Sequence, residues 1–348
     1  MGTYKSDAIR EYEADNWIIM KAEEIADKTK EDYETNAKSI IRRFCKDRNI
    51  AICLGKDLNA EEFVTWLKDG KALQASSTFR YHKSSLVHYL SKHGNPGLSD
   101  EVKKITSRGC KPKGMLKQTS SKKQKYIRQT QHEKISTHLH NLSNSSDNPI
   151  YRILYCCYSS IYIIGMRPQE LNGFSVIDTG GKLICKIANA KNTQGRSFGP
   201  FRHPDISNLA DEDILILRLT SQFCSDDYIT NTLAPQGVAD SWAKLYKKLR
   251  DTFRRAIIDL DFKGKKSIAL YSCRHQFIAD MKQHYSLPEI AALVGHGSSA
   301  TSSELYGRKR YGSSRGRLVI PNDKEVTLVK DMFTTFTPGK KVSPTLNR

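Results

Sequence analysis

The stretch ILYCCYSSIYIIGMRPQE, residues 153–170, joins a long apolar run to an abruptly charged end. The run from Ile153 to Met166 contains no charged residue, and it is too short to span a bilayer, which needs about 20 helical residues. It therefore predicts a helix buried in a protein core. Pro168 is favoured as a first helical residue, so a second helix start is predicted directly behind Arg167. An arginine at such a start can direct its planar fork at an anion.

Four further fragments follow this arginine along the chain. They are Lys191 in Asn189-Ala-Lys-Asn192, Arg274 in Tyr271-Ser-Cys-Arg-His275, His296 in Leu293-Val-Gly-His296 and Tyr306 in Glu304-Leu-Tyr-Gly-Arg308. Each fragment alone is common, because an exposed arginine usually forms a salt bridge and a lone tyrosine is usually a core or surface ring. In this order they predict a reaction in which a tyrosine hydroxyl attacks a phosphodiester while cations hold the phosphate.

These motifs resemble the catalytic domain of the tyrosine recombinase (phage integrase) family. That family has a Gly-x-Arg-x-x-Glu motif, a His-x-x-Arg-His motif, a Leu-Gly-His motif and a terminal Tyr in the same order. The resemblance spans roughly residues 126–312, and residues 28–95 are similar, less specifically, to the helical core-binding domain of the family. It implies a mainly α fold with a small antiparallel β-sheet (α+β), in which two domains form a C-shaped clamp on duplex DNA.

The resemblance also implies a role for each residue. Arg167 and Arg274 would bind the scissile phosphate, and Tyr306 would attack it to form a 3′-phosphotyrosyl intermediate. Lys191 would protonate the leaving 5′-oxygen, and His296 would hydrogen-bond the phosphate. Because the phosphotyrosine retains the energy of the broken bond, neither ATP nor a metal or other cofactor is expected.

Three neighbouring positions complete the expected site. Glu170 and His275 would hold the two arginines in position without contacting the phosphate themselves. Tyr271 stands where the family motif has its first histidine, which leaves the activation of the nucleophile in doubt at this position. A tyrosine hydroxyl can still donate a hydrogen bond to a phosphate oxygen, so we expect activity to survive.

Two of these assignments have rivals within the sequence. Lys182 and Lys186 could replace Lys191 as the general acid, but they fall within a predicted strand rather than at its turn. Tyr311 could replace Tyr306 as the nucleophile, but its surroundings are typical of the start of a tail.

The charge of the chain favours a polyanionic partner. The 348 residues contain 56 Lys+Arg against 37 Asp+Glu, which gives a net charge of +19. Such an excess favours nucleic acid, with an anionic membrane surface as the weaker alternative. The eight cysteines show no CxxC pair, so a disulfide framework or a zinc site is not expected, and a cytoplasmic location, with the nucleoid when bound to DNA, fits better.

Hydrophobic periodicity and composition predict four regions, and the resemblance implies the role of each. Residues 1–95 are expected to form a helical (SAM-like) core-binding domain, 96–125 a basic linker, 126–312 the catalytic domain, and 313–348 a tail that could pack in trans against a neighbouring protomer. The second domain should contain a Gly180-Gly181 hairpin between two strands, a looser third strand near 197–202, and helices at about 131–142, 211–223, 236–259, 272–285, 288–294 and 301–306. The residues expected to contact DNA outside the site are basic: Arg80, Lys83, Lys111, Lys113, Lys122 and Lys123.

The leading hypothesis is a site-specific recombinase that acts as a tetramer on paired sites in double-stranded DNA, for integration or excision of a mobile element. Accessory DNA-bending proteins could assist it, and no membrane is involved. The alternatives are a type IB topoisomerase-like DNA relaxation, resolution of hairpin telomeres, and a DNA-binding protein of the same fold that has lost catalysis.

Overall fold

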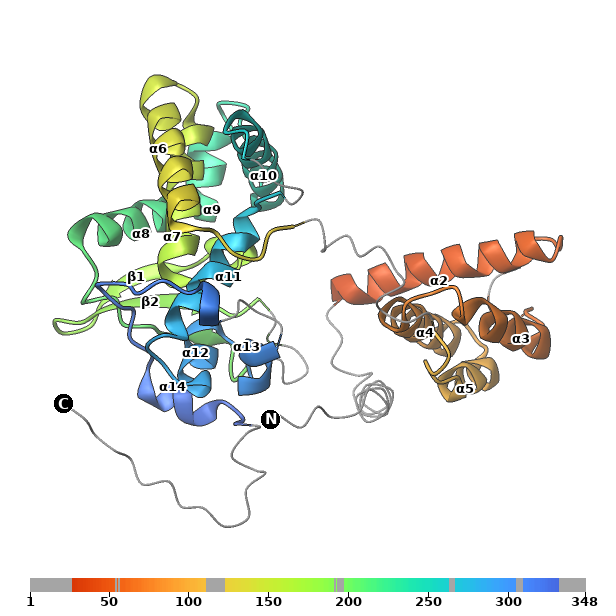
Figure 1. Cartoon of the computed structure of the whole chain (residues 1–348). Helices are drawn as coiled ribbons and strands as arrows, with labels where there is room; N and C mark the ends of the chain where they lie inside the picture. Colours follow the sequence, from red (N-terminus) through yellow and green to blue (C-terminus); the bar gives the residue numbers. More distant parts are fainter. Residues whose placement is uncertain are drawn as a thin grey trace, which may run out of the picture. The chain divides into compact units, whose positions relative to one another are not determined.

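The computed structural model describes residues 27–53, 55, 57–110, 123–190, 192, 197–262, 267–304 and 309–331. The chain divides into two compact units, residues 1–118 and 119–348 (Figure 1). The first is helical in its described part, and the second combines helices with one small sheet.

The first unit packs four helices around an aromatic core. They are α2 (Asp27–Asp47), α3 (Ala60–Lys71), α4 (Ser76–Lys92) and α5 (Pro96–Lys104). The side chain of Asn59 accepts a hydrogen bond from the Glu62 amide and caps α3, as its position before an apolar helix predicts. Phe44 and Phe63 meet edge to face in the core, with ring centroids 5.0 Å apart.

Helix α5 corrects the predicted linker, which begins later than residue 96. Asn95 caps this helix, and Pro96 occupies its first turn. Leu98, Val102 and Ile105 are all buried in the core of the first unit. Their spacing forms one apolar helical stripe, which the surrounding lysines obscure in the sequence. Residues 111–122, the centre of the predicted linker, lie outside the described residues together with Lys111, Lys113 and Lys122.

The burial of Lys83 contradicts its predicted role as a DNA contact. Its side chain is 3% exposed, and its Nζ donates to the carbonyl oxygens of Ile105 at 3.1 Å and Lys103 at 3.5 Å. The Lys83 ammonium group therefore provides hydrogen bonds to carbonyl oxygens at the C-terminal end of α5, where the helix dipole favours a cation. Arg80, on the same helix, is partly exposed, and Lys123 is exposed.

The second unit is built around helix α7 (Pro149–Ile164), which is buried on nearly all its faces, as predicted. Helices α6 (Gln129–Ser145), α8 (Asp211–Phe223), α10 (Trp242–Asp259) and α11 (Leu270–Met281) pack against it (Figure 1). The predicted 236–259 helix begins later, at Trp242. A short helix α9 (Asp226–Tyr228) and a π-helical turn η5 (Ile229–Leu233) precede it, and residues 234–241 connect η5 to α10 through turns and bends.

The small sheet is antiparallel, in the order β1 (Ser175–Asp178), β2 (Leu183–Ala188) and β3 (Phe201–Arg202). Ser175 pairs with Lys186 and Asp178 with Leu183, so the strands are joined by a tight turn. Gly180 and Gly181 both have positive φ angles in that turn, as the hairpin prediction requires. The predicted fold class, mainly α with a small antiparallel sheet, is confirmed.

The tail packs on its own unit up to residue 331; the rest of the segment predicted to pack in trans lies outside the described residues. Ile320 forms a β-bridge with Asp205, and Lys330 forms one with Ser298. Helix α14 (Asp323–Leu328) lies beside α12 (Leu287–Val294), where Val329 packs on two alanines (Figure 1). Helix α13 (Ser299–Glu304) and the turn η6 (Lys309–Tyr311) lie between α12 and this tail in the sequence. Within the described residues, no helix has the length and apolarity needed to span a membrane.

Replacing Gly165 with alanine should strongly destabilise the second unit. Gly165 ends α7 with φ +68°, and a Cβ there would lie 2.1 Å from Cδ1 of the buried Phe277. The clash and the left-handed backbone together should cost about 3 kcal/mol or more. Thermal unfolding measures the change.

Gly180→Ala is the matched control. Its φ of +64° is nearly the same, but nothing lies within 4 Å of the added Cβ. It should cost only about 1–2 kcal/mol. Equal losses in the two variants would show that the packing of Phe277 on Gly165 is not tight.

Candidate active site

A single carboxylate, that of Glu170, organises the most buried charges of the second unit. It lies in the 3₁₀ turn η4 (Pro168–Leu171), directly behind the glycine that ends α7. Its side chain is fully buried and forms ion pairs with Arg167 at 2.5 Å and Arg202 at 2.6 Å. Arg274 Nη1 lies 3.8 Å from the same carboxylate. Three guanidinium groups from distant parts of the chain thus surround one acidic group.

Arg167 is fixed by the local geometry of its turn. Its backbone N–H donates to Glu170 Oε2 at 2.8 Å, and its Nη1 donates to Oε1. This reciprocal arrangement is possible because Pro168 starts the turn and brings the residue at the third helical position back to the cap. Arg167 is 5% exposed.

Arg274 is held from α11 by backbone carbonyls of two other elements. Its Nη1 donates to Gly165 O and its Nη2 to Val294 O, each at 2.7 Å. Nη2 also lies 3.1 Å from His296 Nε2. Because a guanidinium can only donate, Nε2 accepts in this contact, and the proton of the neutral imidazole is on Nδ1. Arg274 therefore ties the ends of α7 and α12 to the cluster.

His296 reaches the cluster because α12 stops one residue before it. Gly295 has φ +68°, a left-handed conformation that ends the helix. A Cβ at Gly295 would lie 2.1 Å from Asn189 Oδ1 and 3.0 Å from Arg202 Nη1. The glycine of the Gly-His pair is thus required by close approach as well as by its backbone conformation.

Arg202 and Asn189 are the site residues that sequence reasoning missed. Arg202 is fully buried, and besides Glu170 it donates through Nη1 to Asn189 Oδ1 at 2.5 Å. Asn189 in turn donates to Gly199 O at 2.8 Å. Arg202 lies in a strand of only two residues, which shows no alternation that could indicate the direction of its side chain.

The cluster carries an excess of buried positive charge. Among the residues that the structure describes, three guanidinium groups stand against one carboxylate, a formal charge of +2. Burial alone would raise the pKa of Glu170, but attraction to Arg202, Arg274 and Arg167 outweighs it and holds that pKa well below its usual value. Burial, together with the nearby Arg274, lowers the pKa of His296 well below its usual value. The site thus contains a carboxylate, a neutral imidazole and three cations.

Tyr271 and His275 lie next to Arg274 on α11, one turn apart, and their rings meet edge to face with centroids 5.4 Å apart. Burial, with smaller effects of Lys125 and Arg274, lowers the pKa of His275 to about 4. Both side chains are partly exposed.

Lys191 and Tyr306 lie outside the described residues. The backbone N–H of Ala190, the residue before Lys191, donates to Glu170 Oε1 at 3.2 Å. Tyr306 falls between α13 and η6.

The rivals are engaged elsewhere. Lys182 Nζ lies 3.9 Å from Asp205, and Lys186 Nζ lies over the ring of Phe201. The Tyr311 ring stacks on Tyr126 at 4.3 Å. Among the described residues, no three His, Cys, Asp or Glu side chains gather as metal ligands.

No protein-family model matches the chain, and no curated protein matches it. Its structure is similar to a lambda integrase dimer bound to a COC' core site, with 15% identity over 90% of this chain and 83% of that chain and a TM-score of 0.47. It is also similar to the XerH site-specific recombinase bound to difH substrate, with 13% identity over 83% of this chain and 90% of that chain and a TM-score of 0.45. All these identities lie below 25% and all TM-scores below 0.5, so we base the function on the geometry of the site.

Glu170→Gln should destabilise the second unit by about 3–5 kcal/mol, because it leaves three buried guanidinium groups without their counter-charge. Thermal or denaturant unfolding measures the loss. Glu133→Gln is the control, since Glu133 is exposed and its carboxylate accepts only a hydrogen bond from Gln129, so its effect should stay within about 0.5 kcal/mol. Similar stabilities for the two variants would mean that Glu170 does not hold the cluster together.

Thermal stability should fall as the pH drops below about 6.5, where an unfolded histidine begins to bind a proton. The folded-state pKa of His296 is depressed, and burial lowers those of His275 and His132 to about 4. The unfolded state therefore takes up protons first, and stability is lost between about pH 6.5 and 4. The contribution of Glu170, whose pKa is also depressed, is lost only at lower pH. A melting temperature constant from pH 7 to 5 would contradict this assignment.

Proposed function

We propose that the chain is a site-specific DNA recombinase of the tyrosine recombinase type, which cleaves and rejoins duplex DNA through a 3′-phosphotyrosyl intermediate. One observation carries the proposal: three arginines, one carboxylate and a neutral histidine are buried together in one cluster. Guanidinium groups match the geometry of phosphate oxygens and bind them through charge-assisted hydrogen bonds.

The cluster is suited to a phosphodiester under attack. In-line attack on phosphorus adds negative charge to the non-bridging oxygens in the transition state, and preorganised cations stabilise that charge. Arg167 and Arg274 would contact those oxygens. His296 would donate a hydrogen bond without adding a charge. Arg202, bonded to both Glu170 and Asn189, would keep the carboxylate and the loop start in place.

The covalent step needs the two residues outside the described part. The Tyr306 hydroxyl would lose its proton to water and attack phosphorus as the bond to the 5′-oxygen breaks, and Lys191 would give that oxygen its proton. Strand joining is the reverse reaction with a 5′-hydroxyl from a second duplex. The new phosphotyrosyl bond keeps the energy of the old one, so no ATP or metal enters this scheme. Tyr271 would donate a hydrogen bond in place of the family histidine, and His275 would support Arg274.

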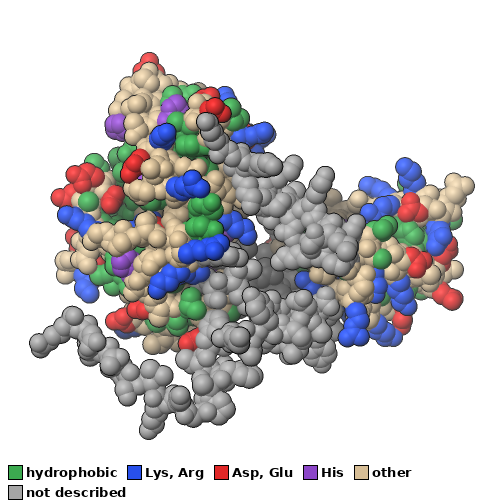
Figure 2. All heavy atoms as spheres, in the orientation of Figure 1, with side chains coloured by type: hydrophobic (Ala, Val, Ile, Leu, Met, Phe, Trp, Pro, Cys, Tyr) green, Lys and Arg blue, Asp and Glu red, His purple; other side chains and the backbone are tan. Residues whose placement is uncertain are grey.

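The charge of the molecule fits duplex DNA as the partner. Lys and Arg side chains are distributed over both units in the face shown in Figure 2. We retain Arg80, Lys123 and the sequence-predicted Lys111, Lys113 and Lys122 as backbone contacts, and we remove Lys83. The two units would close on DNA as a clamp, and four protomers would assemble on paired sites, with accessory DNA-bending proteins where needed. The reaction would serve integration or excision of a mobile element, in the cytoplasm.

Covalent trapping tests the proposal. Nicked duplexes tiled across the DNA that flanks the gene should yield a protein–DNA adduct, because the nick lets the short strand carrying the 5′-hydroxyl diffuse away. Tyr306→Phe should abolish the adduct and change DNA affinity less than about threefold, since it removes one hydroxyl and no cation. An adduct that persists in Tyr306→Phe would move the nucleophile to Tyr311. No adduct on any duplex would favour a DNA-binding protein without catalysis, and relaxation of plasmids lacking paired sites would favour a topoisomerase.

Arg274→Ala should lower the rate of adduct formation at least about 10²-fold, the usual loss when one donor to a developing oxyanion is removed. Arg254→Ala is its matched control, because Arg254 is an exposed arginine on α10 in the same unit. Single-turnover rates at saturating protein separate this effect from binding. Equal rates in the two variants would rule out the cluster as the phosphate site.

A further inference from the structure

Helix α11 has a second buried polar surface, separate from the side that carries Arg274. Gln276 and Asp280 lie one turn apart on it and are 2% and 0% exposed. Gln276 is two residues from Arg274, a rotation of about 200° around the helix, so the two side chains leave in different directions. None of the chemistry above uses this surface.

The amide of Gln276 joins two segments that are distant in the sequence. Its Oε1 accepts a hydrogen bond from the Ile127 backbone N–H at 2.9 Å. Its Nε2 donates to the Tyr311 carbonyl oxygen at 2.9 Å and to Asp280 Oδ1 at 2.7 Å. The rings of Tyr126 and Tyr311 stack beside it, with an interplanar angle of 5°. One side chain thus fastens residues 126–127 and Tyr311 to the same helix.

Asp280 extends the attachment beyond Tyr311. Its Oδ1 accepts from the Ser313 backbone N–H at 2.8 Å, and its Oδ2 accepts from Arg315 Nε at 2.9 Å. Gly312 passes so close to α11 that a Cβ there would lie 2.1 Å from Ala279 O. Gln283 donates to Lys309 O at 2.7 Å. Residues 309–315 are therefore held along α11 at nearly every second position.

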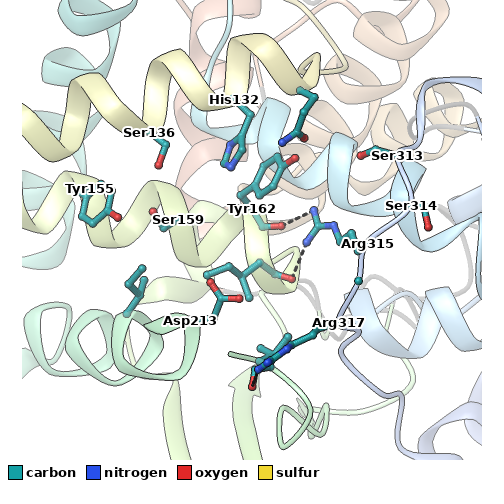
Figure 3. Close-up of a pocket in the computed structure, with 15 residues that line it drawn as sticks. His132, Ser136, Tyr155, Ser159, Tyr162, Asp213, Ser313, Ser314, Arg315 and Arg317 are labelled. Carbon is teal, nitrogen blue, oxygen red and sulfur yellow. Dashed lines mark hydrogen bonds between the residues drawn. The ribbon is translucent and has the colours of Figure 1, made fainter. Parts of the chain in front are cut away.

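Arg315 also attaches this segment to the end of α7. Its Nη2 donates to Tyr162 O at 2.8 Å and its Nη1 to Ile163 O at 3.2 Å (Figure 3). Its guanidinium lies over the Tyr162 ring, 4.6 Å from the centroid, beside a cavity of about 460 Å³. The end of α7 is followed by Gly165 and then Arg167, so Arg315 attaches residues 309–315 to the helix that leads into the proposed phosphate site.

The other segment held by Gln276 is the one through which the chain enters the second unit. Gln124 N donates to Ser267 O at 2.9 Å, and Ser272 Oγ donates to Gln124 O at 2.6 Å. In the sequence, this segment continues from the first unit. A displacement of residues 124–127 would therefore reach Tyr311 through the Gln276 amide and the Tyr126–Tyr311 stack.

We propose that Gln276 is a positioning residue for the tyrosine nucleophile, which it couples to the incoming segment; this rests on the function proposed above. Tyr311 lies five positions after Tyr306, so the Cα atoms of the two tyrosines can be at most about 17 Å apart. Holding the Tyr311 carbonyl thus restricts where the Tyr306 hydroxyl can lie relative to Arg167 and Arg274. Near-attack placement of a nucleophile accounts for a large part of such rates.

Two substitutions distinguish the hydrogen bond that Gln276 accepts from Ile127 from the one that it donates to Tyr311. Gln276→Met keeps the length of the side chain and removes its hydrogen bonds to Ile127, Tyr311 and Asp280. Gln276→Glu keeps an acceptor for the Ile127 N–H, but a carboxyl group has at most one O–H. The carboxylate of Asp280 beside it would take that proton, so Tyr311 O loses its donor. The proposal requires both variants to form the covalent adduct at least about tenfold more slowly at saturating protein, with DNA affinity within about threefold of wild type. A rate for Gln276→Glu equal to wild type would overturn it.

Thr220→Val is the matched control for loss of a buried hydrogen bond. Thr220 is fully buried in α8 and pairs with Ser160 at 2.7 Å, far from α11 in the sequence. It should lower the melting temperature as the Gln276 variants do, yet keep the adduct rate. A rate loss in Thr220→Val as large as in Gln276→Met would show a merely structural effect and overturn the positioning role.

Hydrogen exchange distinguishes failure of this inference from failure of the proposed function. In Gln276→Met, the amides of residues 309–313 should exchange faster than in wild type, while those of α7 stay protected. Unchanged exchange and unchanged rate, with a wild type that forms adducts, would overturn the inference alone. A wild type that forms no adduct on any tiled duplex would overturn the function and the positioning role with it.

Discussion

The carboxylate of Glu170 is the interaction on which the second unit depends. In the described part of the chain it is the acidic group in contact with three fully or almost fully buried guanidinium groups, which come from the start of η4, from β3 and from α11. The same group accepts a backbone N–H from the loop that follows β2. Without it, mutual repulsion of three cations in a poorly hydrated site would separate the elements that carry them. With it, the cluster stays assembled and still carries positive charge for an anion.

The C-terminal ends of two helices place the Arg274 side chain in the cluster. Gly165 and Gly295 stop α7 and α12 in left-handed conformations, and Arg274 donates to a carbonyl at each of these ends. The arginine thereby satisfies carbonyls that a helix terminus leaves without partners. The side chain proposed to bind phosphate is thus also the one that caps two helices, which fixes its guanidinium group to the core around α7.

The sequence predicted those parts of the fold that follow a strong local pattern. The buried α7 follows from a long run without charge, and Arg167 and Glu170 follow from the proline that starts their turn. Arg202 could not be predicted, because a two-residue strand has no periodicity and the loop before it contains no regular pattern. Lys83 was assigned to the surface because the lysines of α5 concealed the apolar stripe that covers it. Local patterns show which face of an element is buried only when the element against which it packs is recognised too.

The tail has a consequence for assembly. Its described part closes on the protomer that carries it, through bridges at Asp205 and Ser298 and through Val329 on the alanines of α12. Within the described residues, this segment covers the alanines of α12 on its own unit. An exchange of the segment between copies would first have to break the two bridges and expose those alanines. Assembly by such an exchange would therefore need a compensating source of free energy, such as binding to a shared DNA.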